Sequence, residues 1–238
     1  TWSVLSCGEP WRVFTVYVWD MSGRFAPRRP ADPRRIWRQA GGLFRRWRYE
    51  ARIEEGRRAW AAGQAPDAAA LAEAARTSVL WRFMATAEPW RLRMDVVERS
   101  GSDDDGRQEI RKEGSRWWAR WADESRSGDD SAGDSVGTDG LELMLCPPDL
   151  VGLLGLRPVS MQVRDGREVV EYVGVLPDRE TELARFEEAS FAIGEWIVLG
   201  SDSIRVAVDT RTTVVVGWQA SIGGKPAGGG ELSDLDIH

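Results

Sequence analysis

The stretch Gly200–Pro226, GSDSIRVAVDTRTTVVVGWQASIGGKP, decides the fold that this sequence predicts. Residues 203–209 alternate between apolar and mostly polar side chains, which is typical of a strand with one buried face. A polar break at 209–212 and a Gly-Gly-Lys-Pro turn at 223–226 bound a second stretch that is rich in β-branched residues. Because residues 231–237 alternate again, the three segments together predict an antiparallel meander.

Further strands are predicted elsewhere in the chain, and short turns join most of them. They lie at residues 11–19, 79–85, 90–98, 107–113, 116–121, 159–163, 169–176 and 191–199. Helical patterns are fewer and occur at 33–52, 67–77 and 149–156. Strands and helices that are segregated in this way favour an α+β fold with one antiparallel sheet. We therefore expect a single domain over residues 1–238, with about nine strands packed against two or three helices.

The segment 33–52 combines an apolar stripe with many arginines. Asp32 is a suitable N-cap residue, and Pro33 suits the first helical position. Apolar residues then recur at spacings of three and four, which predicts an amphipathic helix, although Gly41-Gly42 weakens its middle. Three interpretations stay open: the stripe packs on the sheet, the helix makes a peripheral contact with an anionic membrane, or it binds nucleic acid.

The charge balance of the chain bears on whether nucleic acid is a partner. The chain of 238 residues contains 32 basic and 38 acidic residues and has a formal net charge of -6. Its positive charge is concentrated near the N-terminus, so the remainder is strongly acidic and nucleic-acid binding by the whole chain is not expected. The 13 tryptophans indicate a large apolar core or an apolar lining.

Cysteine content and hydropathy give only weak information on the cellular compartment of the protein. Cys7 and Cys146 form either one bridge or two thiols, and they are too few for a disulfide framework. The sequence shows no apolar run long enough to cross a membrane and no signal peptide, so we expect a cytoplasmic or membrane-associated protein. The chain starts at Thr1, and secretion or a lipid anchor therefore stays open.

Motifs for catalysis, metal binding or cofactor binding are weak. Residues 133–137 match the G-x-S-x-G pattern of a hydrolase nucleophile, but they lie in a polar segment, and His238 is the only imidazole in the chain. Asp103–Gly106 resembles part of a calcium loop without the glutamate that completes it. The acidic segment 123–140 is predicted to be a mobile loop. We expect no enzyme, cofactor or metal site, while a carboxylate-based enzyme stays open as the last alternative.

An apolar sheet face is the remaining candidate for function. Aromatic and aliphatic side chains cluster on the predicted strands at 79–85, 90–98 and 116–121. Such a face either packs against a helix or lines a cavity for an acyl chain or another hydrophobic ligand, and both arrangements need the same residues. The candidate ligand-binding residues are Trp81, Phe83, Trp90, Leu92, Met94 and Trp118.

Four motifs occur in a characteristic order between residues 79 and 237. They are WRFMATAEPWRLRM at 81–94, Arg116-Trp117-Trp118, CPPDL at 146–150, and the closing hairpin at 200–226. Together they resemble the outer-membrane lipoprotein-sorting (LolA-like) superfamily, in an actinobacterial branch. That superfamily includes the lipoproteins LppX and LprG and the sensor half of some anti-sigma regulators. The chain departs from the pattern at 210–212, where a glycine-containing turn is usual, and in its long acidic loop at 123–140.

The resemblance implies an incomplete antiparallel β-barrel that curls around helices and encloses an apolar concavity. In better-known relatives the concavity holds lipid or lipoprotein acyl chains. On that basis we expect a non-enzymatic protein that binds a hydrophobic ligand or a lipoprotein, with the helix at 33–52 acting as a plug. The alternative is a regulatory or scaffolding module of the same fold, whose concavity is filled by its own Leu43, Phe44 and Trp47 and which contacts a protein partner.

Overall fold

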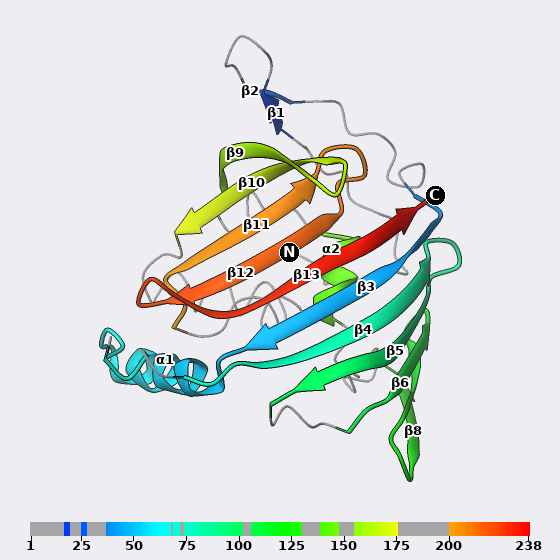
Figure 1. The fold of residues 1–238 in the computed structure, drawn as a ribbon, viewed down its shortest axis with the longest axis horizontal. Helices are drawn as coiled ribbons and strands as arrows, with labels where there is room; N and C mark the ends of the chain where they lie inside the picture. The colour runs from blue at the N-terminus through cyan, green and yellow to red at the C-terminus, as the bar shows by residue number, and fades with distance from the viewer. Residues whose placement is uncertain are drawn as a thin grey trace.

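The computed structural model describes residues 17–19, 25–27, 37–67, 69–71, 74–101, 106–129, 139–147, 155–175 and 200–238. In this part of the chain a curved antiparallel sheet of 11 strands dominates, with two helices beside it (Figure 1). The sheet does not close on itself, since its two outermost strands each pair on one side only. The α+β half-barrel expected from the sequence is therefore confirmed, with more strands than the nine anticipated.

The strand order runs from β8 at one edge of the sheet to β9 at the other. Across the sheet the strands are β8 (Ser125–Asp129), β7 (Arg116–Arg120), β6 (Glu109–Glu113), β5 (Arg91–Ser100), β4 (Thr77–Thr86), β3 (Gln39–Arg48), β13 (Lys225–Ile237), β12 (Val215–Ile222), β11 (Ser203–Asp209), β10 (Arg167–Val175) and β9 (Arg157–Arg164). A separate two-stranded sheet pairs β1 (Tyr17–Trp19) with β2 (Phe25–Pro27). The helices are α1 (Glu50–Ala62) and α2 (Asp139–Leu145).

The C-terminal meander forms as the sequence predicts and lies in the middle of the sheet. β13 pairs with β12 on one side and with β3 on the other, so it joins the two halves of the sheet. Glycines in β13 make room for tryptophans of both neighbours. A Cβ atom on Gly229 would lie 2.5 Å from the ring of Trp47 and 2.6 Å from the carbonyl oxygen of Trp218. A larger residue at this position would push β3 and β12 away from β13.

The predicted arginine-rich helix at 33–52 is wrong, because residues 39–48 form strand β3 in the interior of the sheet. β3 pairs with β4 along its whole length and with β13 on its other side. Ala40 and Phe44 are buried, and their spacing of four residues places them on one face of a strand as well as of a helix. Gly41-Gly42 disfavours the helix, and pairing on both sides stabilises the strand. An amphipathic membrane-binding or plugging helix at this position is thereby excluded.

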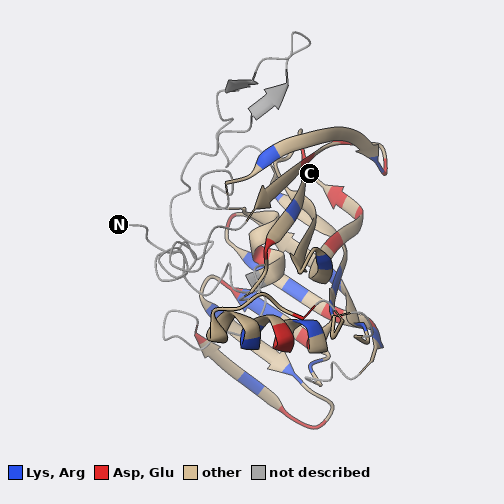
Figure 2. Ribbon diagram, turned by 90° about the vertical axis from the view of Figure 1, so that its left-hand side faces the viewer, with Lys and Arg blue, Asp and Glu red and all other residues tan. Residues whose placement is uncertain are grey.

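A helix does occur nearby, but it begins later than predicted. α1 ends at Gly63, whose φ of 67° lies in the left-handed region that glycine readily adopts. Figure 2 shows acidic and basic residues mixed along α1, and Arg58 pairs with Glu54 and Glu55 there. The surface of α1 is therefore charged in both signs, unlike the basic helix that the sequence predicted.

Two further segments differ from their predictions. The helix expected at 67–77 is replaced, in the described residues, by a turn at 69–71 and by the start of β4 at Thr77. Within the loop predicted at 123–140, Ser125–Asp129 form edge strand β8 because they pair with β7. The predictions for 11–16, 149–154 and 191–199 lie outside the described residues.

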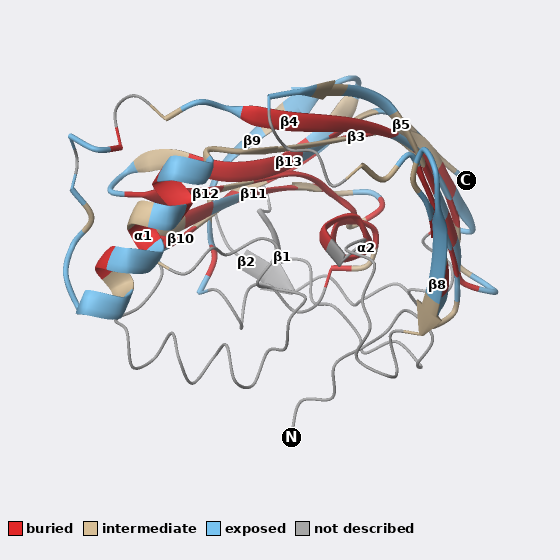
Figure 3. Ribbon diagram, turned by 90° about the horizontal axis from the view of Figure 1, so that it is seen from below, coloured by how far each residue is buried: buried red, intermediate tan, exposed pale blue. Residues whose placement is uncertain are grey.

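The main hydrophobic core lies between the concave face of the sheet and α2 (Figure 3). α2 contributes Leu141, Met144 and Leu145, which are almost completely buried. A smaller cluster joins Ile53 of α1 to Ile222 at the end of β12. The sheet therefore curls around α2, and the concave face of β4 and β5 becomes the inner wall of the half-barrel.

Candidate functional site

Four of the six predicted ligand-binding residues form one patch on the concave face. Trp81 and Phe83 lie on β4, Leu92 and Met94 lie on β5, and Phe83 is directly opposite Met94 in the register. Each of the four is at most 7% exposed and belongs to the main core. Because alternate residues of a strand share a face, the alternation in the sequence was enough to place them together.

Trp90 joins the same core from the turn before β5. Its ring packs edge to face against Trp37, with 6.2 Å between ring centroids and an interplanar angle of 68°. Its indole Nε1 is buried and has no hydrogen-bond partner among the described residues. An unpaired buried donor is costly, so this N–H group is a polar position at which an acceptor on a ligand would gain a hydrogen bond.

Trp118 does not join the other five. Its neighbours Trp117 and Ala119 point into the core, so Trp118 points to the convex face, where the guanidinium of Arg111 lies 5.4 Å from its ring centroid. In a strand, only one of two consecutive tryptophans can face the core. The sequence pattern contained this information, since it placed Trp117 and Trp118 on opposite faces.

An ion pair that the sequence reasoning missed connects the sheet with α2. Lys112 Nζ on β6 lies 2.6 Å from Glu142 Oε1 on α2, and the two side chains are only 3% and 10% exposed. Lys112 faces inward because it lies opposite Leu92 of β5 and Trp117 of β7, which are both core residues. The signal for it was the alternation of Ile110 with Lys112, which puts a charge at an inward position.

The inner wall is thus apolar, except for Lys112, which forms an ion pair with Glu142 of α2. Burying two charges costs desolvation energy that their attraction only roughly offsets, so such a pair contributes little net stability. It does restrict geometry, since α2 must lie where the Glu142 carboxylate reaches Lys112 Nζ. Tyr172 of β10 lies on the same wall, and burial raises the pKa of its hydroxyl above the ordinary value.

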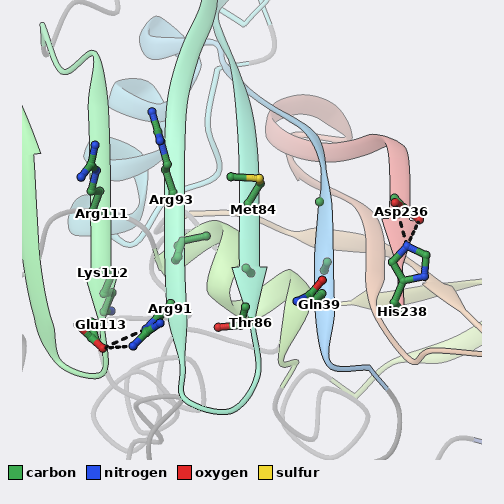
Figure 4. A pocket seen from close by; sticks show the side chains of 14 residues that line it. Gln39, Met84, Thr86, Arg91, Arg93, Arg111, Lys112, Glu113, Asp236 and His238 are labelled. Atoms are coloured by element: carbon green, nitrogen blue, oxygen red, sulfur yellow. Dashed lines mark hydrogen bonds and ion pairs between the residues drawn. The ribbon is translucent and has the colours of Figure 1, made fainter.

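A hollow of about 540 Å³ opens on the other, convex side of the sheet (Figure 4). It runs across β13, β3, β4, β5 and β6, and Met84 and Gly41 lie in its middle. Arginines line it on the β5–β6 side, and Asp236 with His238 lines it on the β13 side. Of the predicted ligand-binding residues only Leu92 contacts this hollow, so it is not the concavity that the sequence predicts.

Arginines beside this hollow are neutralised by neighbouring carboxylates. Arg91 Nη2 lies 2.9 Å from Glu113 Oε1, and Arg93 Nε donates to Asp95 Oδ2 at 2.9 Å. The hydrogen bond and charge of Asp95 raise the pKa of Arg93 above its ordinary value. Glu109 accepts from Arg111 Nε at 2.7 Å. Because these cations already have partners, the hollow is not an open anion site.

The described residues show no arrangement typical of a catalytic or metal site. Within them, no group of three or more His, Cys, Asp or Glu side chains could hold a metal ion. His238 is exposed and its Nε2 lies 3.0 Å from Asp236 Oδ1. Neither of the two described helices combines the length and apolar character that crossing a bilayer requires. Cys7, the acidic turn at 103–105 and the G-x-S-x-G segment at 133–137 lie outside the described residues.

Comparison with known proteins gives similarity in fold but not in sequence. No family model and no curated protein matches the chain. Similar solved structures include the lipoprotein LppX of Mycobacterium tuberculosis, with 11% identity and a TM-score of 0.45 over 86% of this chain and 89% of that one. They also include the MucA/MucB complex of Pseudomonas aeruginosa, with 12% identity and a TM-score of 0.44 over 86% and 53%.

A LolA-superfamily protein from Nitrosomonas europaea is also similar in structure. It shares 9% identity with this chain, and the match has a TM-score of 0.31 over 86% of this chain and 87% of that one. These names belong to the superfamily that the sequence motifs resemble. All three matches share at most 12% identity with this chain and have TM-scores of 0.45 or less, so they say nothing about a ligand.

Proposed function

We propose that this protein is a non-catalytic binding protein that holds a hydrophobic or lipidated chain inside its half-barrel. The observation that supports this proposal is the apolar inner wall of β4 and β5, whose side chains form one buried cluster with those of α2. In the described residues this helix is tied to the sheet by the ion pair between Lys112 and Glu142. A ligand chain takes the place of the α2 side chains, while the strands stay paired.

The exchange of α2 for a ligand chain is energetically balanced. Burying one CH₂ group contributes about 0.8 kcal/mol, and burying a leucine or methionine side chain contributes about 1.5–3 kcal/mol. A chain of about ten CH₂ groups therefore offsets the exposure of Leu141, Met144 and Leu145. α2 is 7 residues long, so it has little helix stability of its own when it leaves the sheet.

Native mass spectrometry of the purified protein, combined with lipid extraction, tests the proposal directly. We expect a co-purified apolar ligand, and saturable binding of a fluorescent fatty acid once that ligand has been removed. Recovery of no lipid together with no saturable binding of the fatty acid would contradict ligand binding.

A pair of matched variants shows whether the ligand enters under α2. The double variant Lys112→Met/Glu142→Leu replaces the ion pair by apolar contacts that hold α2 on the sheet, and we expect fatty-acid binding to weaken by about tenfold. Its control, Arg91→Ala/Glu113→Ala, removes an ion pair of the convex face and should leave binding unchanged. An equal effect of both double variants would mean that the ligand does not displace α2.

The alternative is a regulatory or scaffolding module whose closed half-barrel contacts a protein partner. One observation favours it: five of the six predicted ligand-binding side chains are already buried, in one core cluster with the apolar residues of α2. The filling helix is α2 and not the segment with Leu43, Phe44 and Trp47, which belongs to β3. A stable protein that binds no fatty acid in either the wild type or the Lys112 variants supports this second function.

A further inference from the structure

The two edges of the sheet are built differently. β8 is a strand of 5 residues, SRSGD, and its side chains are polar or absent. β9, at the other edge, has 8 residues, RPVSMQVR, and within the described part of the chain it pairs only with β10. A free edge presents unpaired backbone N–H and C=O groups to any other strand. β8 follows the usual protection of an edge by short length and polar side chains. β9 has Pro158 and a bulge near its start, but its pairing is regular from Ser160 onward, and it exposes apolar side chains between Val159 and Val163.

Apolar side chains are exposed along β9. Val159, Met161 and Val163 are 56%, 62% and 71% exposed, and Val175 on neighbouring β10 is also exposed. Together they are four of the six large apolar side chains that are exposed in the described residues. Such a concentration on one hairpin is typical of an interaction surface.

Charges mark both ends of this edge. Arg157 begins β9 and Arg164 ends it, both are exposed, and the strand contains no acidic residue. The nearby Glu171 of β10 lies 4.0 Å from Arg164 and 3.6 Å from Arg205, so it is shared between two cations. The edge is therefore apolar in its middle and basic at its ends.

We infer that β9 is a docking site for an extended segment of another protein, which adds to the sheet as a further strand. The backbone edge supplies the hydrogen bonds, and the exposed side chains of Val159, Met161 and Val163 require apolar residues at alternate positions of the partner. Arg157 and Arg164 require acidic residues at the two ends of the partner segment.

A second copy of this chain fits the edge less well than an acidic segment. If two β9 strands paired antiparallel along their whole length, Arg157 of each copy would lie opposite Arg164 of the other. Like charges directly opposite each other in a sheet are destabilising. Charge complementarity therefore selects a different protein, independently of what the half-barrel holds.

Peptide binding to the intact protein tests this assignment. The probe is a labelled peptide of about eight residues, with alternating valine and threonine and a glutamate at each end; a second peptide carries lysine at each end. We expect the glutamate peptide to bind about tenfold more tightly in fluorescence anisotropy. In hydrogen exchange it should protect residues 157–164.

Two variants separate the edge from general surface effects. Met161→Lys places a charge on the edge strand, and we expect it to weaken peptide binding by about tenfold or more. Val97→Lys alters another exposed valine, on β5, and should have no effect; thermal unfolding checks that both variants fold. Equal binding of the two peptides, equal effects of the two variants, or protection outside β9 would overturn the assignment. A dimer that Met161→Lys dissociates would show that a second copy occupies the edge instead.

Discussion

The inner and outer faces of strands β4 to β7 come from the same alternating sequences but carry charge in different ways. On the inner face, Lys112 and Glu142 form a buried pair that ties α2 to the sheet. On the outer face, Arg91 and Glu113 form a pair in which both side chains are largely exposed. The difference teaches that the burial of an ion pair, and not the number of ion pairs, determines its energetic effect.

Removing one partner of the Lys112–Glu142 pair should give the largest loss of stability. Lys112→Ala leaves the Glu142 carboxylate buried beside an apolar wall, and we expect a loss of about 3–5 kcal/mol in the free energy of unfolding. Urea denaturation followed by circular dichroism measures this loss. A loss below about 1 kcal/mol would show that Glu142 reaches solvent and that the two faces do not differ as described.

The double variant Lys112→Met/Glu142→Leu is the control for that interpretation. It removes both charges at once, so it should be about as stable as the wild type or more stable. If the double variant lost as much stability as Lys112→Ala, the cause would be lost packing around β6 and not the removal of the positive charge beside Glu142.

Aromatic residues allow the same comparison between the inner and outer faces of the sheet. Phe83→Ala opens a cavity in the inner core and should cost about 3–5 kcal/mol. Trp118→Ala on the outer face removes mainly its contact with Arg111 and should cost about 1 kcal/mol or less. Thermal unfolding monitored by circular dichroism compares the two. Similar losses for both would place Trp118 in the core, contrary to the strand alternation.

The Arg91–Glu113 pair on the outer face should contribute least to stability. A double-mutant cycle with Arg91→Ala and Glu113→Ala should yield a coupling energy of about 0.2–1 kcal/mol. That coupling should decrease when the salt concentration rises, because both side chains are exposed and screened. Chemical denaturation at low and high salt measures it, and a coupling that is large and independent of salt would mean that the outer face is also shielded from solvent.

Most strands were predictable because their alternation is local. Trp81, Phe83, Leu92 and Met94 face inward as their spacing predicts. The failure at β3 has a local cause, since the spacing of Ala40 and Phe44 fits a strand and a helix equally well. Gly41-Gly42 disfavours the helix, but the strand is fixed by the pairing with β4 and β13, which is not visible in the segment itself.

Other features could not be predicted because they depend on residues outside the segment that forms them. β8 has a weak strand pattern, Ser-Arg-Ser-Gly-Asp, and exists because β7 pairs with it. The cover of the inner wall depends on Lys112 finding Glu142, which lies 30 residues further along the chain. The pattern around Lys112 shows that a charge points inward, but it does not show which residue neutralises that charge.

The central place of β13 has a consequence for the biosynthesis of this protein. β3 is synthesised well before β13, and Ala40 pairs with Ile237, which follows it along the chain by the length of most of the sheet. Until β13 is made, β3 is an unpaired edge strand of the incomplete sheet. Contacts between residues so far apart in the sequence form slowly. The completed sheet can therefore assemble only after translation of β13, and a newly made chain passes through an aggregation-prone interval in which chaperones have access to β3.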